Sequence, residues 1–288
     1  MIHIILIGDV HTHFTEADVN FFNQSDADLI LFVGDLANYR EKEGIDTAKI
    51  ISGITKPALF IPGNHDTVTA VQLLAEIKWS QAKRDLLAKG QPKRVQRLLD
   101  ALAPVQVGGY STHHYQFGED SFDLIVGRPY SLGGPKINYI AQLKRQYNVV
   151  DMTGSIAKLK QCVDDAKSNT LLFLAHNGPT GLGDKRDDIW GCDFWEDAGD
   201  FGDPDLSEAI QYAKMREKQV LGVFAGHMHQ QLKGGGLRKM IVECDGTTYL
   251  NAGYVPRIFG ENGRIHHQYI AITLEQNRLT HDFCTFSP

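Results

Sequence analysis

Five short apolar runs in this chain each end in a cluster of polar residues, and this pattern constrains the fold more than any other feature. Each run has the length and the β-branched content of a buried strand. Uninterrupted apolar runs fit strands that are covered on both faces, as in α/β proteins. The runs are His3–Ile7, Leu29–Val33, Ala58–Ile61, Leu171–Ala175 and Leu221–Ala225.

The polar clusters that follow these runs are rich in Asp, Asn and His, a composition that packing alone does not produce. In open α/β sheets, ligands bind at the carboxyl ends of the strands. We therefore predict an α/β fold in which the clusters converge on one functional site. The clusters are Gly8–His11, Gly34-Asp35, Gly63–Asp66, His176-Asn177 and Gly226–His229.

The segments between the apolar runs have the composition of helices and of further strands. In Arg94–Leu102 the apolar residues recur at helical spacing, with Pro92 near the start and Pro104 just past the end. Asp205 or Ser207 is expected to cap a later helix. Other helices are predicted at Ala70–Trp79, Ala82–Lys89, Ile156–Ala166 and Leu206–Lys218, and strands at Phe122–Val126, Thr248–Asn251, Gln268–Leu274 and Thr280–Phe286.

The composition is that of an ordinary globular protein. The chain has 288 residues, 42% hydrophobic and 22% charged, which suits a single α/β domain. A net charge of -6 argues against a surface that binds nucleic acid. The first apolar run is too short for a signal peptide, and no run approaches the roughly 20 apolar residues that span a bilayer. With four cysteines and no C-x-x-C pair, we expect a cytoplasmic protein without a membrane partner.

One stretch, residues 184–205, differs from the rest of the chain because it is crowded with acids and also carries aromatic residues. It follows closely after the cluster at His176. We interpret it as a long loop or small insertion near the mouth of the site, or as a solvated loop whose aromatic residues reach the core. In the first interpretation, its acids would repel polyanions and favour small substrates.

The side chains of the five clusters match the needs of divalent metal ions. Carboxylate and amide oxygens suit hard ions, imidazole suits borderline ions, and the clusters contain no thiolate. Such a set suits Mn, Fe, Zn or Mg. Two ions about 3.5–4 Å apart can grip a phosphoryl group and activate a water molecule.

Taken in order, the blocks GDVH, GD, GNHD, H and GHMH resemble those of the calcineurin-like metallophosphoesterase superfamily. All five are present between Asp9 and His229. The resemblance implies a sandwich of two mixed β-sheets flanked by α-helices, in one domain over residues 1–288. Segments near 70–104 and 184–205 would be insertions into that domain.

The resemblance also implies a role for each polar residue of the blocks. The first metal would be held by terminal ligands, the second by another three residues, and one carboxylate would bridge both ions. His65 would sit beside the phosphate, and Asp66 would orient it. The implied ligands are Asp9, His11 and His229 for the first ion, Asn64, His176 and His227 for the second, and Asp35 as the bridge.

Departures from known branches of the superfamily narrow the expected activity. The block GDLANYR replaces the GDxVDRG of protein phosphatases, and GNHD replaces their GNHE. Purple acid phosphatases have Tyr where this chain has Asn38, and they lack the counterpart of His11. Repair exonucleases share GNHD, but they normally carry longer C-terminal parts, so a nuclease ranks low and a nucleic-acid partner is not expected.

We therefore expect a dinuclear metal-dependent phosphoesterase, with Mn favoured, that uses a metal-activated hydroxide. The blocks favour a small-molecule phosphodiester or nucleotide substrate. The alternatives are a phosphomonoesterase, then a nuclease, and a non-catalytic metal-binding scaffold. Asn38, Tyr39 and Arg40 are candidates for the pocket wall, as is the turn at Asn177–Gly181. The sequence indicates no oligomeric state.

Overall fold

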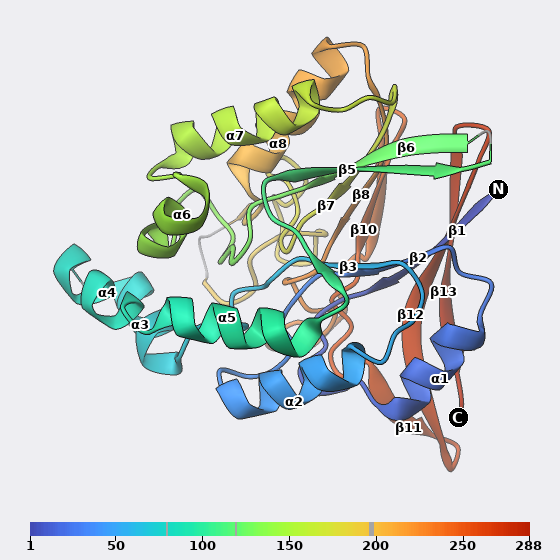
Figure 1. Ribbon diagram of the computed structural model, residues 1–288, viewed down its shortest axis with the longest axis horizontal. Helices are drawn as coiled ribbons and strands as arrows, with labels where there is room; N and C mark the ends of the chain where they lie inside the picture. Colours follow the sequence, from blue (N-terminus) through green and yellow to red (C-terminus); the bar gives the residue numbers. More distant parts are fainter. Residues whose placement is uncertain (79, 119, 196–198) are drawn as a thin grey trace.

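The computed structural model describes residues 1–78, 80–118, 120–195 and 199–288, which form two β-sheets packed face to face with helices on both outer sides (Figure 1). The first sheet has the strand order β11-β12-β1-β2-β3-β4, with β13 also paired to β12. Its strands are β1 (Ile2–Ile7), β2 (Leu29–Phe32), β3 (Ala58–Phe60), β4 (Gln106–Val107), β11 (Ile258–Glu261), β12 (Arg264–Glu275) and β13 (Arg278–Phe286).

The second sheet has the order β5-β6-β7-β8-β10-β9. The strands β6, β7, β8 and β10 run parallel, and antiparallel strands β5 and β9 form the two edges. The expected sandwich of two mixed sheets is therefore confirmed. The strands are β5 (Ser111–Phe117), β6 (Asp120–Val126), β7 (Thr170–Leu174), β8 (Gln219–Ala225), β9 (Ile241–Cys244) and β10 (Thr247–Asn251).

Helices cover the outer face of each sheet. On the first sheet these are α1 (Glu16–Gln24), α2 (Glu41–Ile51) and α5 (Gln91–Leu102), and on the second they are α7 (Met152–Asp164) and α8 (Pro204–Met215). The remaining helices are α3 (Ala70–Lys78), α4 (Gln81–Ala88) and α6 (Ile140–Tyr147), and they lie together at one side (Figure 1).

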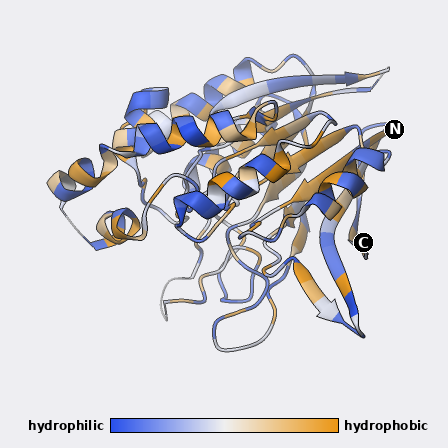
Figure 2. Ribbon diagram, turned by 60° about the horizontal axis from the view of Figure 1, so that its bottom comes forward, coloured by the Kyte–Doolittle hydropathy of each residue, from blue (hydrophilic) through white to orange (hydrophobic). Residues whose placement is uncertain are grey.

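The uninterrupted apolar runs are explained by cores on both faces of each parallel strand. In β2, Leu29 and Leu31 enter the core between the sheets, whereas Ile30 and Phe32 pack against α1, α2 and α5. All four side chains are buried. Figure 2 shows the hydrophobic strands at the centre and the polar faces of the helices outside. Because both faces are covered, these strands have no polar alternation.

Several predicted element boundaries need correction. Helix α8 begins at Pro204 with Asp203 as its N-cap, not at Asp205 or Ser207, because proline is favoured in the first helical turn. Residues 70–78 form the helix predicted at 70–79, and Trp79 lies outside the described residues. The helices α1, α2 and α6 and the strands β4, β5, β9 and β11 were not predicted.

Candidate metal centre

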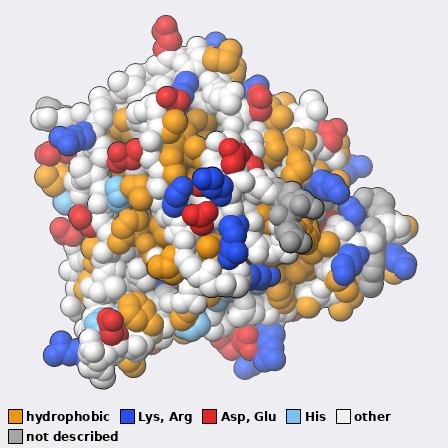
Figure 3. Space-filling view, turned by 180° about the vertical axis from the view of Figure 1, so that it is seen from behind, with side chains coloured by type: hydrophobic (Ala, Val, Ile, Leu, Met, Phe, Trp, Pro, Cys, Tyr) orange, Lys and Arg blue, Asp and Glu red, His pale blue; other side chains and the backbone are white. Residues whose placement is uncertain are grey.

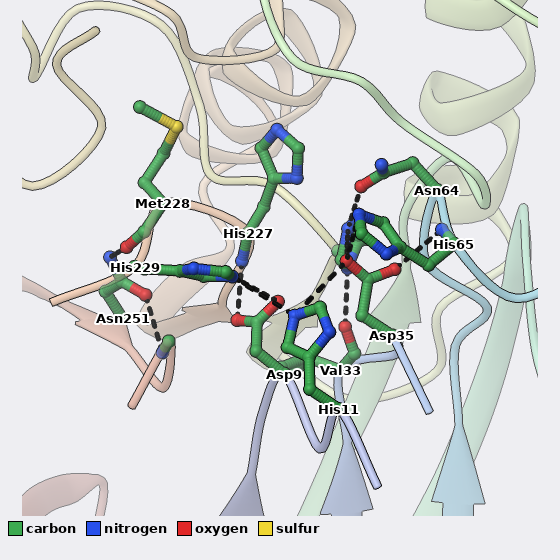
Figure 4. Close-up of polar contacts among 12 residues, drawn as sticks. Asp9, His11, Val33, Asp35, Asn64, His65, His227, Met228, His229 and Asn251 are labelled. Carbon is green, nitrogen blue, oxygen red and sulfur yellow. Dashed lines mark hydrogen bonds and ion pairs between the residues drawn. The ribbon is translucent and has the colours of Figure 1, made fainter. Parts of the chain in front are cut away.

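The five polar clusters meet at the carboxyl ends of β1, β2, β3, β7 and β8, as predicted (Figure 4). The loops turn so sharply there that Asp9, His11 and Asp35 have positive φ angles of 44°, 42° and 53°. Non-glycine residues rarely adopt this region, and such strain gathers at functional sites. The fold therefore holds the backbone of these three residues in a conformation that they would not adopt by local preference.

Glycines beside the candidate ligands leave room for the carboxylates. A Cβ atom on Gly63 would lie 2.2 Å from Asp35 Oδ1, and one on Gly226 would lie 2.3 Å from Asp9 Oδ2. Neither position can carry a side chain without moving a carboxylate. The motif glycines are thus explained by close packing around the two acids.

Two groups of three side chains could each hold a metal ion. Within each group, the candidate ligand atoms all lie within 4.8 Å of one another. One oxygen of Asp9 is fully buried and has no hydrogen-bond partner among the described residues, an arrangement that a bound cation would satisfy. The groups are Asp9, His11 and His229, and Asp35, His176 and His227.

The carboxylate of Asp35 lies between the two groups. Its Oδ2 is 4.0 Å from His11 Nε2 in the first group and 3.5 Å from His176 Nε2 in the second. Asn64 belongs to the second group, because its Oδ1 lies 2.9 Å from the same His176 nitrogen. The structure thus brings together all seven residues predicted as ligands.

Backbone groups outside the two clusters fix the imidazole rings. His176 Nδ1 lies 2.6 Å from the carbonyl oxygen of Val33, and His227 Nε2 lies 3.2 Å from that of Leu132. When one ring nitrogen donates to a carbonyl, the other carries the lone pair that a metal requires. Sequence reasoning missed both carbonyl partners, because a backbone acceptor carries no side-chain signal.

Burial and neighbouring charges shift the pKa values of the site residues in opposite directions. Burial lowers the pKa of His11 to about 4 and also lowers that of His227. Burial alone would raise the pKa of Asp35, but the facing imidazoles of His65 and His176 lower it overall. Burial and the charge of Asp35 raise the pKa of Asp9. A cation between these two acids would relieve their repulsion, so the donor set fits divalent metal ions.

Asp66 does not orient His65, contrary to the prediction. Its carboxylate accepts hydrogen bonds from the amides of Asp35, Leu36 and Gly63 at 2.9, 2.6 and 2.7 Å. Nδ1 of His65 has no hydrogen-bond partner among the described residues. Asp66 therefore fastens the loop after β2 to the loop after β3, because its oxygens are occupied by backbone donors.

Tyr39 is the residue that packs on His65. The two rings are stacked, with centroids 3.7 Å apart and planes 24° from parallel. The Tyr39 hydroxyl also contacts the Asn64 side chain, and Asn38 contacts His11. The loop after Asp35 thus lines both candidate metal groups, as expected from its position next to the GD block.

Four acids of residues 184–205 are ion-paired and give no support to an acidic, repelling mouth. Asp188 contacts Lys239, Asp193 contacts Arg238, and both Asp203 and Asp205 contact the buried Arg128. The cations lie far from these acids in the sequence, so the pairing could not be predicted. These four acids therefore serve the local structure.

The comparisons agree with the site geometry. The family model described as calcineurin-like phosphoesterase matches residues 2–231. No curated protein matches the chain significantly. A dimetal phosphatase from Danio rerio has a similar fold, with a TM-score of 0.50 and 11% identity over 99% of this chain and 98% of that chain.

A second solved structure with a similar fold is a Staphylococcus aureus protein assigned as a 5'-nucleotidase. It has a TM-score of 0.51 and 10% identity, over 99% of this chain and 54% of that chain. At such low identity, both likenesses concern the fold alone. The family match covers most of the sequence and includes all the candidate ligands, so the chain belongs to the calcineurin-like phosphoesterase family.

Proposed function

We propose that the protein is a hydrolase of small phosphate esters that uses two divalent metal ions. The observation that carries the proposal is the carboxylate of Asp35, which belongs to one group of candidate ligands and also lies 4.0 Å from His11 Nε2 in the other. One carboxylate facing both groups allows two ions to sit close together. This spacing is the basis of two-metal phosphoryl chemistry.

Each candidate ligand has a proposed place. Asp9, His11 and His229 would hold the first ion, and Asn64, His176 and His227 would hold the second. Asp35 would serve both ions. The lowered pKa values of His11 and His227 keep those rings neutral at neutral pH, which is the form that binds metal.

Two bound ions would supply a water of lowered pKa and positive charge for the phosphate oxygens. The protein supplies the geometry around them. His65 lies at the edge of the site, with Nε2 3.7 Å from Asp35 Oδ2, and is placed to contact an ester oxygen. Tyr39 covers one face of the His65 ring and so restricts its orientation. Preorganised donors of this kind stabilise charge that develops in a transition state.

A phosphodiester or nucleotide substrate is favoured over a simple monoester. A monoester carries a further charged oxygen that an additional cation would bind. Both arginines beside His65 have other partners: Arg40 pairs with Glu43, and Arg94 donates to the Thr67 carbonyl. On the face seen from behind Figure 1, Lys and Arg are interspersed with Asp and Glu (Figure 3), so that face has no uniformly basic surface for a polyanion.

The test compares hydrolysis of bis-p-nitrophenyl phosphate and p-nitrophenyl phosphate by the manganese-loaded protein. The variant Asp35→Asn removes the bridging charge, and Asp46→Asn makes the same change at an exposed position in α2. We expect turnover of the diester to exceed that of the monoester. Asp35→Asn should lose at least 100-fold in kcat, whereas Asp46→Asn should keep the wild-type rate.

Other outcomes separate the alternatives. A preference for the monoester would favour a phosphomonoesterase and contradict the proposed substrate class. Activity that survives Asp35→Asn would contradict the two-metal proposal itself. Failure of the folded, metal-loaded protein to hydrolyse any of a panel of diesters, nucleotides and monoesters would favour a metal-binding scaffold.

A further inference from the structure

A buried guanidinium joins the GHMH loop to the first part of the acidic segment. Arg238 is only 3% exposed and lies nine residues after His229. Its Nε donates to the carbonyl oxygen of His229 at 3.0 Å. Its other nitrogens donate to the carbonyl oxygens of Arg186, Asp188 and Gly191 at 3.0, 2.9 and 2.5 Å, and to Asp193 Oδ1 at 3.1 Å.

We name residues 185–193 the strap, because further contacts tie it to the loops of the candidate metal centre. Asn251 Nδ2 donates to the carbonyl of Met228 in the GHMH loop at 2.7 Å (Figure 4). It also donates to the carbonyl of Ile189 in the strap at 3.2 Å. The indole of Trp190 lies against Gly178, where a Cβ atom would be 1.9 Å from the ring. The strap thus contacts both segments that carry candidate histidine ligands of the second sheet.

His229 is the member of its group with the least support from its surroundings. Its side chain is 38% exposed, whereas those of Asp9 and His11 are buried. The loop of His11 is fixed by a hydrogen bond from the His11 amide to the Asp35 carbonyl at 2.8 Å. The backbone of His229 is held instead by the Arg238 hydrogen bond to its carbonyl oxygen and, at the next residue, by the Gln230 amide, which donates to the Gly253 carbonyl at 2.8 Å.

We propose that Arg238 is a positioning residue for His229, and that it acts by fastening the strap against the GHMH loop. Arg238 does not contact substrate or metal in this proposal, which rests on the two-metal function proposed above. The strap supplies four of the five acceptors, and His229 supplies the fifth. Loss of the guanidinium therefore loosens His229 first, because His227 in the same loop is held separately, by its amide to Asp9 Oδ2 at 2.7 Å and by its ring to the Leu132 carbonyl at 3.2 Å.

Arginine is the side chain suited to this role. Its planar group presents five N–H donors in a fixed arrangement, whereas lysine presents three donors around one point. The carboxylate of Asp193 accepts from Nη2 and balances the buried charge, while the two N–H groups of Nη1 are shared among three strap carbonyls. A lysine at this position keeps the charge but cannot reach acceptors on both sides at once.

The adjacent residue provides a matched control. Lys239 contacts the same strap through Asp188 Oδ1 at 2.7 Å, but its side chain is 56% exposed and makes no hydrogen bond or ion pair with the GHMH loop among the described residues. The variant Lys239→Met therefore removes a strap contact without touching His229. The variants His229→Ala and His176→Ala serve as references for loss of the first and second ligand groups.

The experiment measures manganese binding to the full chain by equilibrium dialysis and records the electron paramagnetic resonance spectrum of the bound metal. Wild type and Lys239→Met should bind two equivalents with a spin-coupled spectrum. Arg238→Lys should keep one tight equivalent and bind the second about 10–100-fold more weakly, the usual effect of losing an outer partner of a ligand. Its spectrum should become that of an isolated ion and match His229→Ala.

The opposite results would overturn the inference. Arg238→Lys would then bind both manganese ions with wild-type affinity, or bind both more weakly by the same factor, or give a spectrum that matches that of His176→Ala. Circular dichroism checks that the variant folds. If Arg238→Lys does not fold, Asp193→Ala replaces it, because this variant leaves Arg238 with its carbonyl acceptors. Asp193→Ala should weaken binding of the same manganese ion by a smaller factor. Wild-type affinity for that ion would overturn the inference.

The same data separate this inference from the proposed function. A wild-type protein that binds two ions but hydrolyses no phosphate ester would refute the hydrolase, while the Arg238 result would stand on its own. A wild-type protein that never binds a second ion would refute both, because Arg238 would then have no metal ligand to position.

Discussion

The residues of the candidate metal centre are so closely packed that two glycine positions leave no room for a side chain. The glycines at 63 and 226 lie against the carboxylates of Asp35 and Asp9. Tyr39 stacks on His65, and Trp190 lies on the backbone of the loop after His176. Small changes at these positions should therefore affect the site through displacement of neighbours rather than through lost chemistry.

Replacing Gly226 by Ala should displace Asp9, because the new Cβ would lie 2.3 Å from Asp9 Oδ2. We expect a loss of about 1–3 kcal/mol in the free energy of unfolding, the usual cost of overpacking. Urea denaturation measures it. Gly44→Ala in α2 is the control, since its Cβ would meet only Ala37 Cβ at 3.8 Å. Equal stability of both variants would contradict the packing argument.

Replacing Tyr39 by Leu should lower kcat for the diester about 2–10-fold, the equivalent of an aromatic pair worth about 0.5–1.5 kcal/mol. The reason is that the His65 ring loses the surface that restricts it. Tyr39→Phe keeps the ring and loses only the hydroxyl contact with Asn64, so its kcat should fall less than that of Tyr39→Leu. A leucine variant as active as wild type would show that the stacking has no catalytic effect.

The candidate ligands could be recognised in the sequence, because Asp, Asn and His are common metal ligands and here they follow the ends of strands. The groups that hydrogen-bond to these ligands could not be predicted. The partners of His176 and His227 are carbonyls, and the role of Asp66 depends on which backbone amides come within reach. These depend on loop geometry that no local pattern encodes.

At the scale of elements, strands with two covered faces were predictable and elements at the edges were not. The run in β2 is apolar throughout because it separates two cores. The edge strand β5 has the partly exposed sequence STHHYQF, which lacks a clear apolar alternation. The short helix α6 is capped by Tyr139 and Asn148, both in the left-handed conformation. Helix propensities do not predict such caps.

A buried ion cluster fixes the start of α8 next to the strap. Arg128, which follows β6, lies 3.0 Å from Asp203 and 2.8 Å from Asp205. Asp203 is also bonded by Asn177, the residue after His176. Burial raises the pKa of Asp203 to about 6, although the guanidinium of Arg128 opposes the shift. The cluster therefore connects α8 to the loop that carries a candidate ligand.

Replacing Arg128 by Met should cost about 3–5 kcal/mol at pH 8, because it leaves two buried carboxylates without a cation. Loss of the cation raises the pKa of Asp203 further, so the folded variant binds more protons than the unfolded chain. Stability of the variant therefore falls as the pH rises from 5 to 8, more steeply than that of wild type. Urea denaturation across this range is the measurement. A difference from wild type that does not change with pH would contradict the account.

Across the whole molecule, the candidate metal centre joins the two sheets. Asp9, His11 and Asp35 follow strands of the first sheet, and His176, His227 and His229 follow strands of the second. Ions bound there would cross-link the halves of the sandwich. Among the helices that the structure describes, none has the length and apolar composition needed to cross a membrane.

Manganese should therefore raise the melting temperature of the wild-type protein. A ligand that binds only the folded state adds about 2.7 kcal/mol at 100 times its Kd. Asp35→Asn should lose most of this gain, because its neutral amide faces both ligand groups. Calorimetry with manganese and with chelator measures the effect. An equal gain in wild type and Asp35→Asn would place the bound metal elsewhere.

The most direct test of the central claim is a titration of metal-free protein with manganese, in which diester hydrolysis is measured against the equivalents bound. The account predicts that the rate rises with occupancy of the second ion and reaches its maximum at two equivalents. A maximum at one equivalent, or hydrolysis that does not depend on added metal, would contradict a two-metal phosphoesterase.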